Sequence, residues 1–180
     1  MARRRVGLLA LQGGYAVHGA MLERVDCLPV EVRVPDDLNE LDGLILPGGE
    51  STTQLRLIHR FDLADALDEF MTLERPVLAT CAGLILASSR VTSPEQRAFG
   101  WLDLDVCRNG WGRQVFSFEA EADIKTTKDA FGPDPVPMMF IRAPRIIRVG
   151  STVKTLGEYR GEPVLVQQDA LVGATFHPEL

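Results

Sequence analysis

Cysteine is scarce in this sequence, with three residues in 180, at the widely separated positions Cys27, Cys81 and Cys107. An odd number of distant cysteines with no CxxC pair excludes a disulfide framework and a zinc ribbon. We therefore expect a reducing, cytoplasmic setting and no structural metal.

Long apolar runs are missing as well. Gly, Pro or charged residues interrupt every candidate before it reaches the roughly 20 residues that a membrane helix needs. The opening MARRRVGLLALQGG resembles a signal peptide, but its apolar run covers only residues 6–11 and stops at Gln12. We interpret this run as a buried first strand and expect no membrane association.

Basic residues are fewer than acidic ones. The chain has 19 Lys and Arg against 25 Asp and Glu, a formal net charge of -6, and no long basic run beyond Arg3, Arg4 and Arg5. This disfavours nucleic acid as a partner, because such binding needs clustered cations. The expected partners are small molecules or other proteins.

Short apolar runs alternate with helical patterns in the first half of the chain. This order predicts right-handed crossovers and a mostly parallel sheet, with functional groups at the carboxyl ends of its strands. Ser51 and Asp62 are the expected N-caps of two of the helices. Strands are predicted over 6–11, 29–34, 43–46 and 76–80, and helices over 16–25, 52–59, 63–73 and 82–88.

The second half is rich in alternating apolar and polar residues, a period typical of strands. The predicted fold class is α/β, with three layers: a mostly parallel central sheet flanked by helices, and extra antiparallel strands in the second half. No linker or repeat interrupts residues 1–180, so one domain is expected. These later strands are predicted over 101–106, 115–122, 138–141, 164–167 and 171–176, with a surface loop at 131–137.

Cys81 is the sharpest chemical feature. It lies between a predicted strand and a predicted helix in the string ATCAG, whose small residues permit a tight turn that presents the side chain. The start of a helix also favours the thiolate, the nucleophilic form of cysteine. The alternative is a buried structural cysteine, because cysteine is among the most buried residue types.

His177 and Glu179 stand near the end of the sequence in the string FHPEL. In an extended segment two residues that far apart share a face, so the carboxylate can orient the imidazole. With Cys81 as nucleophile the three residues match the logic of a catalytic triad. The alternative is a solvated turn. His18 and His59 stand in no comparable context.

Two further features are compatible with binding. Gly48 and Gly49 follow an apolar strand, where backbone N–H groups can converge on an anion or oxyanion, although the segment lacks the lysine of a Walker loop and the GxGxxG spacing. Arg108 and Arg142 stand at predicted strand ends, where a guanidinium can hold a carboxylate. The alternatives are an ordinary turn and two solvated surface charges.

Six strings, read in order along the chain, resemble one family. Together they resemble the glutaminase subunits of pyridoxal 5′-phosphate synthase, a branch of the triad-type (class I) glutamine amidotransferases. PGGESTT, the pattern RQVxSFE and FIRAP separate this branch from other triad glutaminases. The strings are ALQGG at 10–14, GLILPGGESTT at 43–53, TCAGLILA at 80–87, RNGWGRQVFSFEA at 108–120, FIRAP at 140–144 and FHPEL at 176–180.

The resemblance implies a flavodoxin-like mixed sheet and hydrolysis of L-glutamine to L-glutamate and ammonia, with no cofactor and no metal. It implies that Cys81 is the nucleophile that forms a γ-glutamyl thioester. It also implies that His177 is the base and then the acid, and that Glu179 orients it. The glutamine and oxyanion contacts that it implies are Gly48, Gly49, Glu50, Ser51, Ala82, Arg108, Ile141 and Arg142.

The implied partner is a separate synthase subunit, which builds the pyridine ring from two sugar phosphates and receives the ammonia through a tunnel. A large hetero-oligomer follows, with weak glutaminase activity until the partner orders the oxyanion loop. Two alternatives stay open. One is the glutaminase of another ammonia-transfer system, such as that of imidazole glycerol phosphate synthesis. The other is a catalytically inactive docking module.

The sequence departs from the family pattern at several places. Ala79 stands where the family usually has Gly, and Phe116 where it usually has Asp. Residues 13–25 differ from the usual first helix, a region implicated in partner contact. Relatives usually continue into a terminal helix, so either the sequence is shortened at Leu180 or this member lacks that helix.

Overall fold

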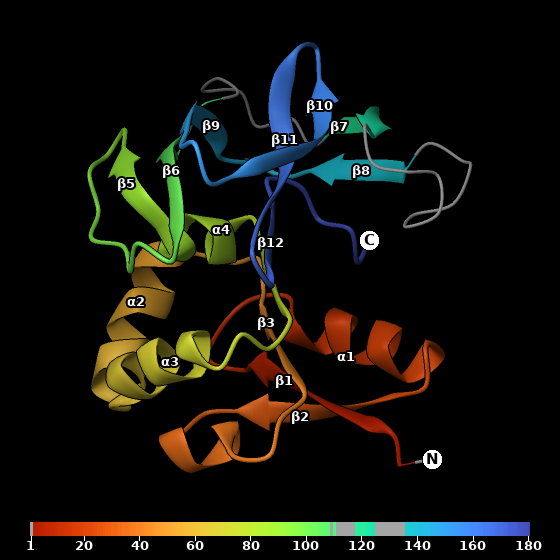
Figure 1. The fold of residues 1–180 in the computed structure, drawn as a ribbon, viewed down its shortest axis with the longest axis vertical. Helices are drawn as coiled ribbons and strands as arrows, with labels where there is room; N and C mark the ends of the chain where they lie inside the picture. The colour runs from red at the N-terminus through yellow and green to blue at the C-terminus, as the bar shows by residue number, and fades with distance from the viewer. Residues whose placement is uncertain (1, 109, 111–117, 125–135) are drawn as a thin grey trace.

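Five parallel strands form one half of a nine-stranded central sheet. The computed structural model describes residues 2–108, 110, 118–124 and 136–180 (Figure 1). Continuous apolar runs are typical of such strands, which are covered on both faces. In spatial order they are β2 (Cys27–Val32), β1 (Arg4–Leu9), β3 (Gly43–Leu46), β4 (Val77–Thr80) and β12 (Leu171–Ala174).

Four antiparallel strands complete this sheet beyond β12. They come from the second half of the chain, where alternating residues predict strands with one covered face. In spatial order they are β11 (Glu162–Gln168), β10 (Lys154–Tyr159), β7 (Phe118–Ile124) and β8 (Val136–Phe140).

A smaller sheet has three strands, in the order β5 (Ser88–Thr92), β6 (Leu102–Cys107) and β9 (Arg145–Val149). The β5 and β6 strands are parallel, and β9 runs antiparallel to β6. This sheet was not expected as a separate unit.

Helices cover both faces of the parallel strands. Figure 1 shows α1 on one side of these strands and α2 and α3 on the other, which confirms the predicted three layers. No helix in the described part of the chain is long and apolar enough to cross a membrane. The helices are α1 (Tyr15–Arg24), α2 (Ser51–Arg60), α3 (Leu63–Thr72) and α4 (Ala82–Ala87), with a short 3-10 turn, η1 (Pro35–Leu38).

Most predicted elements of the first half are present, but the first two strands both begin two residues earlier than expected. The strand expected over 29–34 lies at Cys27–Val32. The first strand was expected over 6–11 and lies at Arg4–Leu9. Backbone pairing of Arg4 with Cys27 and of Arg5 with Leu28 extends it toward the N-terminus. Arg4 is exposed and Arg5 is half-buried, so apolar character alone does not reveal the strand.

The predictions are weaker in the second half. Three strands, β5, β9 and β10, were not predicted, because their residues are largely polar or half-exposed. Ser88 was assigned to the preceding helix and begins β5 instead. Residues 115–117 of one predicted strand, Phe116 among them, lie outside the described residues. So do 131–135 of the predicted loop.

Two hydrophobic clusters follow the two halves of the central sheet. The larger packs around the parallel strands and α4, where Leu44, Leu46 and Leu84 are fully buried. The smaller surrounds the antiparallel strands and includes Phe140 and Phe176. Every residue of β3 is buried, as expected from its uninterrupted apolar run. The clusters hold the carboxyl ends of the parallel strands in fixed positions.

Candidate active site

Four neighbouring strand ends meet at one edge of the sheet. The strands β1, β3, β4 and β12 are adjacent and parallel, so their carboxyl ends lie side by side. Functional groups gather at such edges in open α/β sheets. The four segments that leave these ends carry Gln12, Gly48, Cys81 and His177, respectively.

Cys81 occupies a sharp turn between β4 and α4. Its φ of 46° and ψ of -102° are unusual for a residue with a side chain, and strain of this kind clusters at functional sites. The backbone N–H of Cys81 donates to Ala174 O on β12 at 2.9 Å. Gly83 lets α4 pack close behind it, because any side chain there would overlap Leu46 O. The structure thus has the predicted strand, turn and helix geometry.

His177 and Glu179 form a buried pair rather than a solvated turn. The Nδ1 atom of His177 lies 2.8 Å from Glu179 Oε1. The backbone N–H of His177 donates to Met139 O on β8 at 2.9 Å, which fixes the segment. On its other side the imidazole lies against Gly48, where any side chain would overlap the ring. The two residues are therefore held in one orientation.

The electrostatics link this pair to Cys81. Burial disfavours the imidazolium form of His177, but hydrogen bonds to the Cys81 side chain and to Glu179 outweigh it and raise its pKa to about 10. Burial also disfavours the Glu179 carboxylate, yet the hydrogen bond to His177 and the electrostatic interaction with His18 lower its pKa. The site therefore favours a charged His177 beside a charged Glu179, with Cys81 next to the imidazole.

His18 is a residue that the sequence analysis missed. It lies on α1 with only 3% of its surface exposed. Its Nε2 is 3.4 Å from Glu179 Oε2 and 3.4 Å from Thr80 Oγ1. Burial lowers the pKa of His18, although the Glu179 carboxylate acts in the opposite sense. The local sequence gives no sign of this role, because the neighbours of His18 in space lie far away along the chain.

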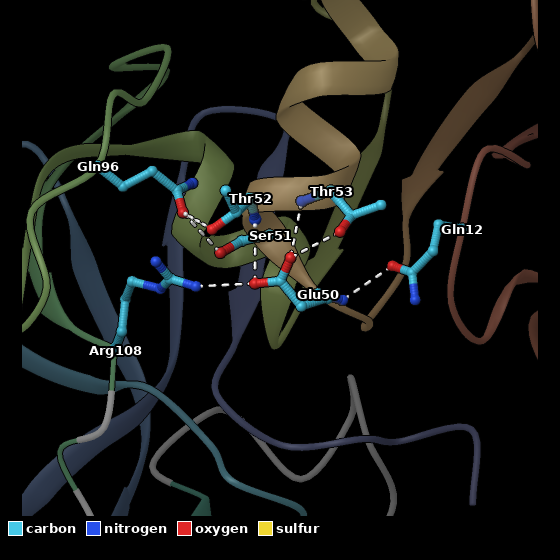
Figure 2. A network of polar contacts seen from close by, with 7 residues as sticks. All are labelled: Gln12, Glu50, Ser51, Thr52, Thr53, Gln96 and Arg108. Carbon is cyan, nitrogen blue, oxygen red and sulfur yellow. Dashed lines mark hydrogen bonds and ion pairs between the residues drawn. The ribbon is translucent and has the colours of Figure 1, made fainter.

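Glu50 is the centre of a second polar network, drawn in Figure 2. Its carboxylate accepts hydrogen bonds from Thr52 N at 3.3 Å and Thr53 N at 2.7 Å, and so caps α2. Arg108 Nη2 donates to Glu50 Oε1 at 2.9 Å. Burial acts to raise the pKa of Glu50, but the hydrogen bonds from Thr53 and Thr52 lower it. The expected cap, Ser51, is instead the first residue of the helix.

Two glutamines brace the Gly48 and Gly49 turn. The side-chain Oε1 of Gln12 accepts from Glu50 N at 2.8 Å (Figure 2). The Nε2 of Gln54, which is fully buried, donates to Gln12 O at 3.0 Å and to Pro47 O at 3.1 Å. Gly49 has no room for a side chain, because a Cβ would lie 2.6 Å from Gln12 Oε1. The turn after β3 is thus tied to the turn after β1.

Ser51 faces away from the cap and contacts Gln96. The hydroxyls of Ser51 and Thr52 donate to Gln96 Oε1 at 2.9 Å and 3.2 Å (Figure 2). Gln96 lies in the segment between β5 and β6, so the start of α2 is held against the smaller sheet. Arg108, which follows β6, approaches Glu50 from the same direction.

The remaining predicted residues border this region. Ala82 is buried and begins α4, directly after Cys81. Ile141 and Arg142 follow β8, the strand whose Met139 binds the His177 backbone. Ile141 is half-buried and Arg142 is exposed, with a left-handed φ of 46°. The fold therefore places all the predicted site residues at the carboxyl edge or on segments joined to it.

Sequence reasoning missed Gln12, Gln54 and Gln96 as well as His18. The one available signal was Gln12 itself, a polar residue that ends a buried strand just before two glycines. Gln54 and Gln96 lack a local signal, since their partners come from other elements. Within the described residues no cluster of His, Cys, Asp or Glu is suited to a metal ion.

Comparison with known protein families gives a match over most of the chain. The model of the SNO glutamine amidotransferase family matches residues 8–180. The chain is 47% identical over 178 residues to the pyridoxal 5′-phosphate synthase subunit PdxT of Solibacter usitatus (strain Ellin6076), covering 98% of this chain and 92% of that protein. It is 44% identical over 177 residues to the PdxT subunit of Kosmotoga olearia, covering 98% and 90%.

Comparison with solved structures also finds glutamine amidotransferases of similar fold. A crystal structure of a glutamine amidotransferase superposes with a TM-score of 0.88 at 37% identity, covering 97% of this chain and 90% of that one. The structure of PurLQS from Thermotoga maritima superposes with a TM-score of 0.74 at 16% identity, covering 99% and 89%. The second likeness shows a shared fold alone.

Proposed function

The chain belongs to the SNO glutamine amidotransferase family, and from this premise we propose that Cys81, His177 and Glu179 perform its chemistry. The activity is hydrolysis of L-glutamine to L-glutamate and ammonia, as the glutaminase subunit of pyridoxal 5′-phosphate synthase. One observation carries the residue assignment: Cys81 and the hydrogen-bonded pair of His177 and Glu179 lie at adjacent strand ends, and interaction with Cys81 and Glu179 raises the pKa of His177 to about 10.

In the first step, the Cys81 thiolate attacks the side-chain amide carbon of glutamine. The carbonyl oxygen becomes an oxyanion, and a new carbon–sulfur bond forms. The His177 imidazolium then gives its proton to the amide nitrogen, the carbon–nitrogen bond breaks, and ammonia leaves. The products of this step are a γ-glutamyl thioester on Cys81 and a neutral His177.

In the second step, water resolves the thioester. Neutral His177 takes a proton from the attacking water, and Glu179 stabilises the resulting imidazolium through Nδ1. The carbon–sulfur bond then breaks, which releases glutamate and restores the thiolate beside an imidazolium. The raised pKa of His177, about 10, is suited to this resting ion pair.

The oxyanion needs hydrogen-bond donors, and the ammonium and carboxylate groups of glutamine need opposite charges. Backbone N–H groups at the Gly48 and Gly49 turn and at Ala82 are the proposed oxyanion donors. Glu50 and Arg108, 2.9 Å apart, present opposite charges that complement the ammonium and carboxylate groups of an amino acid. Ser51, Ile141 and Arg142 are proposed to complete the glutamine site.

A synthase subunit is the partner that accepts the ammonia. The PdxT relatives are named as subunits of pyridoxal 5′-phosphate synthase, so we propose that this chain joins a hetero-oligomer with that subunit. In such an assembly ammonia passes directly to the pyridine-forming site.

The deciding experiment is glutamate release from glutamine by the purified chain, with and without a pyridoxal 5′-phosphate synthase subunit. We expect release that rises sharply with the partner. The Cys81→Ala variant should release no glutamate, because it has lost the nucleophile. It should still bind the synthase and support product formation from added ammonium salts.

Two outcomes would contradict the proposal. Wild-type turnover by Cys81→Ala would exclude Cys81 as the nucleophile. Absence of glutamate with and without the partner, from a folded wild-type chain that still binds it, would indicate an inactive docking module instead.

A further inference from the structure

The Glu179 carboxylate has two oxygens, and the proposed mechanism uses only one of them. Oε1 lies 2.8 Å from His177 Nδ1. Oε2 is buried, and no described residue gives it a hydrogen bond of ordinary geometry. A buried carboxylate oxygen without a donor is costly, so such an atom calls for a functional explanation.

His18 is the polar group that faces this oxygen. Its Nε2 stands 3.4 Å from Glu179 Oε2, and both side chains are almost completely buried, with 4% and 2% of their surfaces exposed. His18 comes from α1, on the opposite face of the sheet from α4. The carboxylate is therefore enclosed between two histidines that arrive from different elements.

We propose that His18 is a positioning residue for the catalytic triad, whose Nε2–H anchors Glu179 Oε2 so that Oε1 faces His177. This inference rests on the proposed function. The present separation is long for a hydrogen bond, but contacts of this kind often tighten only in the complex with substrate.

A neutral donor suits this place better than a cation. Burial lowers the pKa of His18, the Glu179 carboxylate opposes the shift, and the charge of His177 adds to it. A neutral imidazole still donates one hydrogen bond and does not compete with the His177 cation for the carboxylate. Thr80 Oγ1, 3.4 Å from the same Nε2, provides a second polar neighbour from β4.

Among the described residues, three groups face the Glu179 carboxylate. His177 comes from its own segment, His18 from α1, and the Gly14 backbone lies close to Oε1. Removing the His18 donor should raise the pKa of Glu179, because the buried carboxylate then loses a stabilising partner. The pKa of His177 should fall in turn.

The test compares variants of His18 in the glutaminase assay with the synthase subunit. His18→Leu fills the space without a donor, and we expect kcat to fall about ten- to a hundredfold with KM changed less than about twofold. The acid limb of the kcat/KM profile should move up by about one pH unit. His18→Gln, whose amide can reach Oε2, should retain kcat within about threefold.

Two further variants separate positioning from folding. His18→Asn keeps a polar side chain that is too short to reach Oε2, so its kcat should fall as much as expected for His18→Leu. This variant keeps the test valid if His18→Leu folds poorly. His59→Leu, an exposed histidine on α2, is the matched control and should keep wild-type activity.

A readout independent of turnover separates this inference from the proposed function. The titration midpoint of His177, followed by NMR of labelled histidine, should fall in His18→Leu and His18→Asn and stay near the wild-type value in His18→Gln. Full kcat with an unshifted acid limb in His18→Asn would overturn the role of His18. Absence of wild-type glutaminase activity would overturn the proposed function alone, since the NMR titration needs no turnover.

Discussion

Glu179 shows how much of this site depends on single residues. A carboxylate that is almost completely buried is rare unless it is paired. Here it is held by His177 on one side and faces His18 on the other. The same low exposure that makes the charge costly also makes its interaction with the imidazole strong. Any change to this charge should therefore act on catalysis.

Glu179→Gln keeps the size of the side chain and removes its charge. We expect kcat to fall by about a thousandfold or more, because an amide stabilises the His177 imidazolium poorly and can select the wrong tautomer. KM for glutamine should change far less, since in the proposed mechanism Glu179 acts through His177. Steady-state kinetics with saturating synthase subunit measures both constants.

An unchanged kcat in Glu179→Gln would demote Glu179 to a structural role. The matched control is Glu158→Gln, a carboxylate on β10 outside the proposed site. It should leave kcat at the wild-type value. The fall in kcat of Glu179→Gln would then come from the place of Glu179 beside His177 and not from the loss of one negative charge.

At the scale of elements, α2 depends on a residue that serves two purposes. Glu50 accepts hydrogen bonds from the first free N–H groups of the helix, and it also pairs with Arg108. A side-chain cap is worth about 1 kcal/mol to a helix. Stability and the proposed binding of glutamine are therefore coupled at the start of α2.

Glu50→Ala removes both contacts. We expect the free energy of unfolding to fall by about 1 kcal/mol, measured by urea denaturation, because the α2 N–H groups lose their acceptor. We also expect KM for glutamine to rise, because the charge opposite Arg108 is gone. Glu50→Gln should lose less stability, since its amide oxygen still accepts, while its KM rises similarly.

Asp62→Asn is the control for the Glu50 cap, because Asp62 precedes a helix without capping it. Asp62 precedes α3 with a left-handed φ of 56° and makes no side-chain cap bond, contrary to the sequence-based expectation. Asn tolerates the same backbone conformation, so stability should stay within about 0.5 kcal/mol. A loss as large as that of Glu50→Ala would contradict the capping explanation.

At the scale of the whole molecule, the charge state of His177 contributes to stability. Its pKa is raised from 6.5 to about 10 in the folded protein, where burial is outweighed by hydrogen bonds to Cys81 and Glu179. The folded chain therefore holds this proton more tightly than the unfolded chain does. The contribution is fully present below pH 6.5 and is lost as the pH rises through about 10.

His177→Gln should flatten this dependence. Between pH 6.5 and 9.5 the wild-type free energy of unfolding, measured with urea, should fall more steeply than that of the variant. His59→Gln, at an exposed histidine, should follow the wild-type slope. Equal slopes for wild type and His177→Gln would contradict the raised pKa.

Local patterns in the sequence were enough to predict the parallel half of the fold. The apolar run of β3, the helical stripe of α3 and the strand, turn and helix around Cys81 each carry their signal within a few consecutive residues. Strand β9 lacks such a signal, because it pairs with β6, far along the chain. Strand β10 forms a hairpin with its neighbour β11, but its residues KTLGEY show no clear alternation of apolar and polar side chains. Backbone pairing, not composition, makes them strands.

The sequence by itself determined the chemical types at the site: a cysteine in a tight turn, a histidine with a carboxylate two residues on, and a glycine turn after a strand. Only the tertiary structure decided which groups meet. The side-by-side order of β1, β3, β4 and β12 brings Gln12 to the glycine turn and His177 to Cys81, and packing of α1 brings His18 to Glu179. The reason is physical: hydrogen bonds and charges act over a few ångströms of space, whatever the separation along the chain.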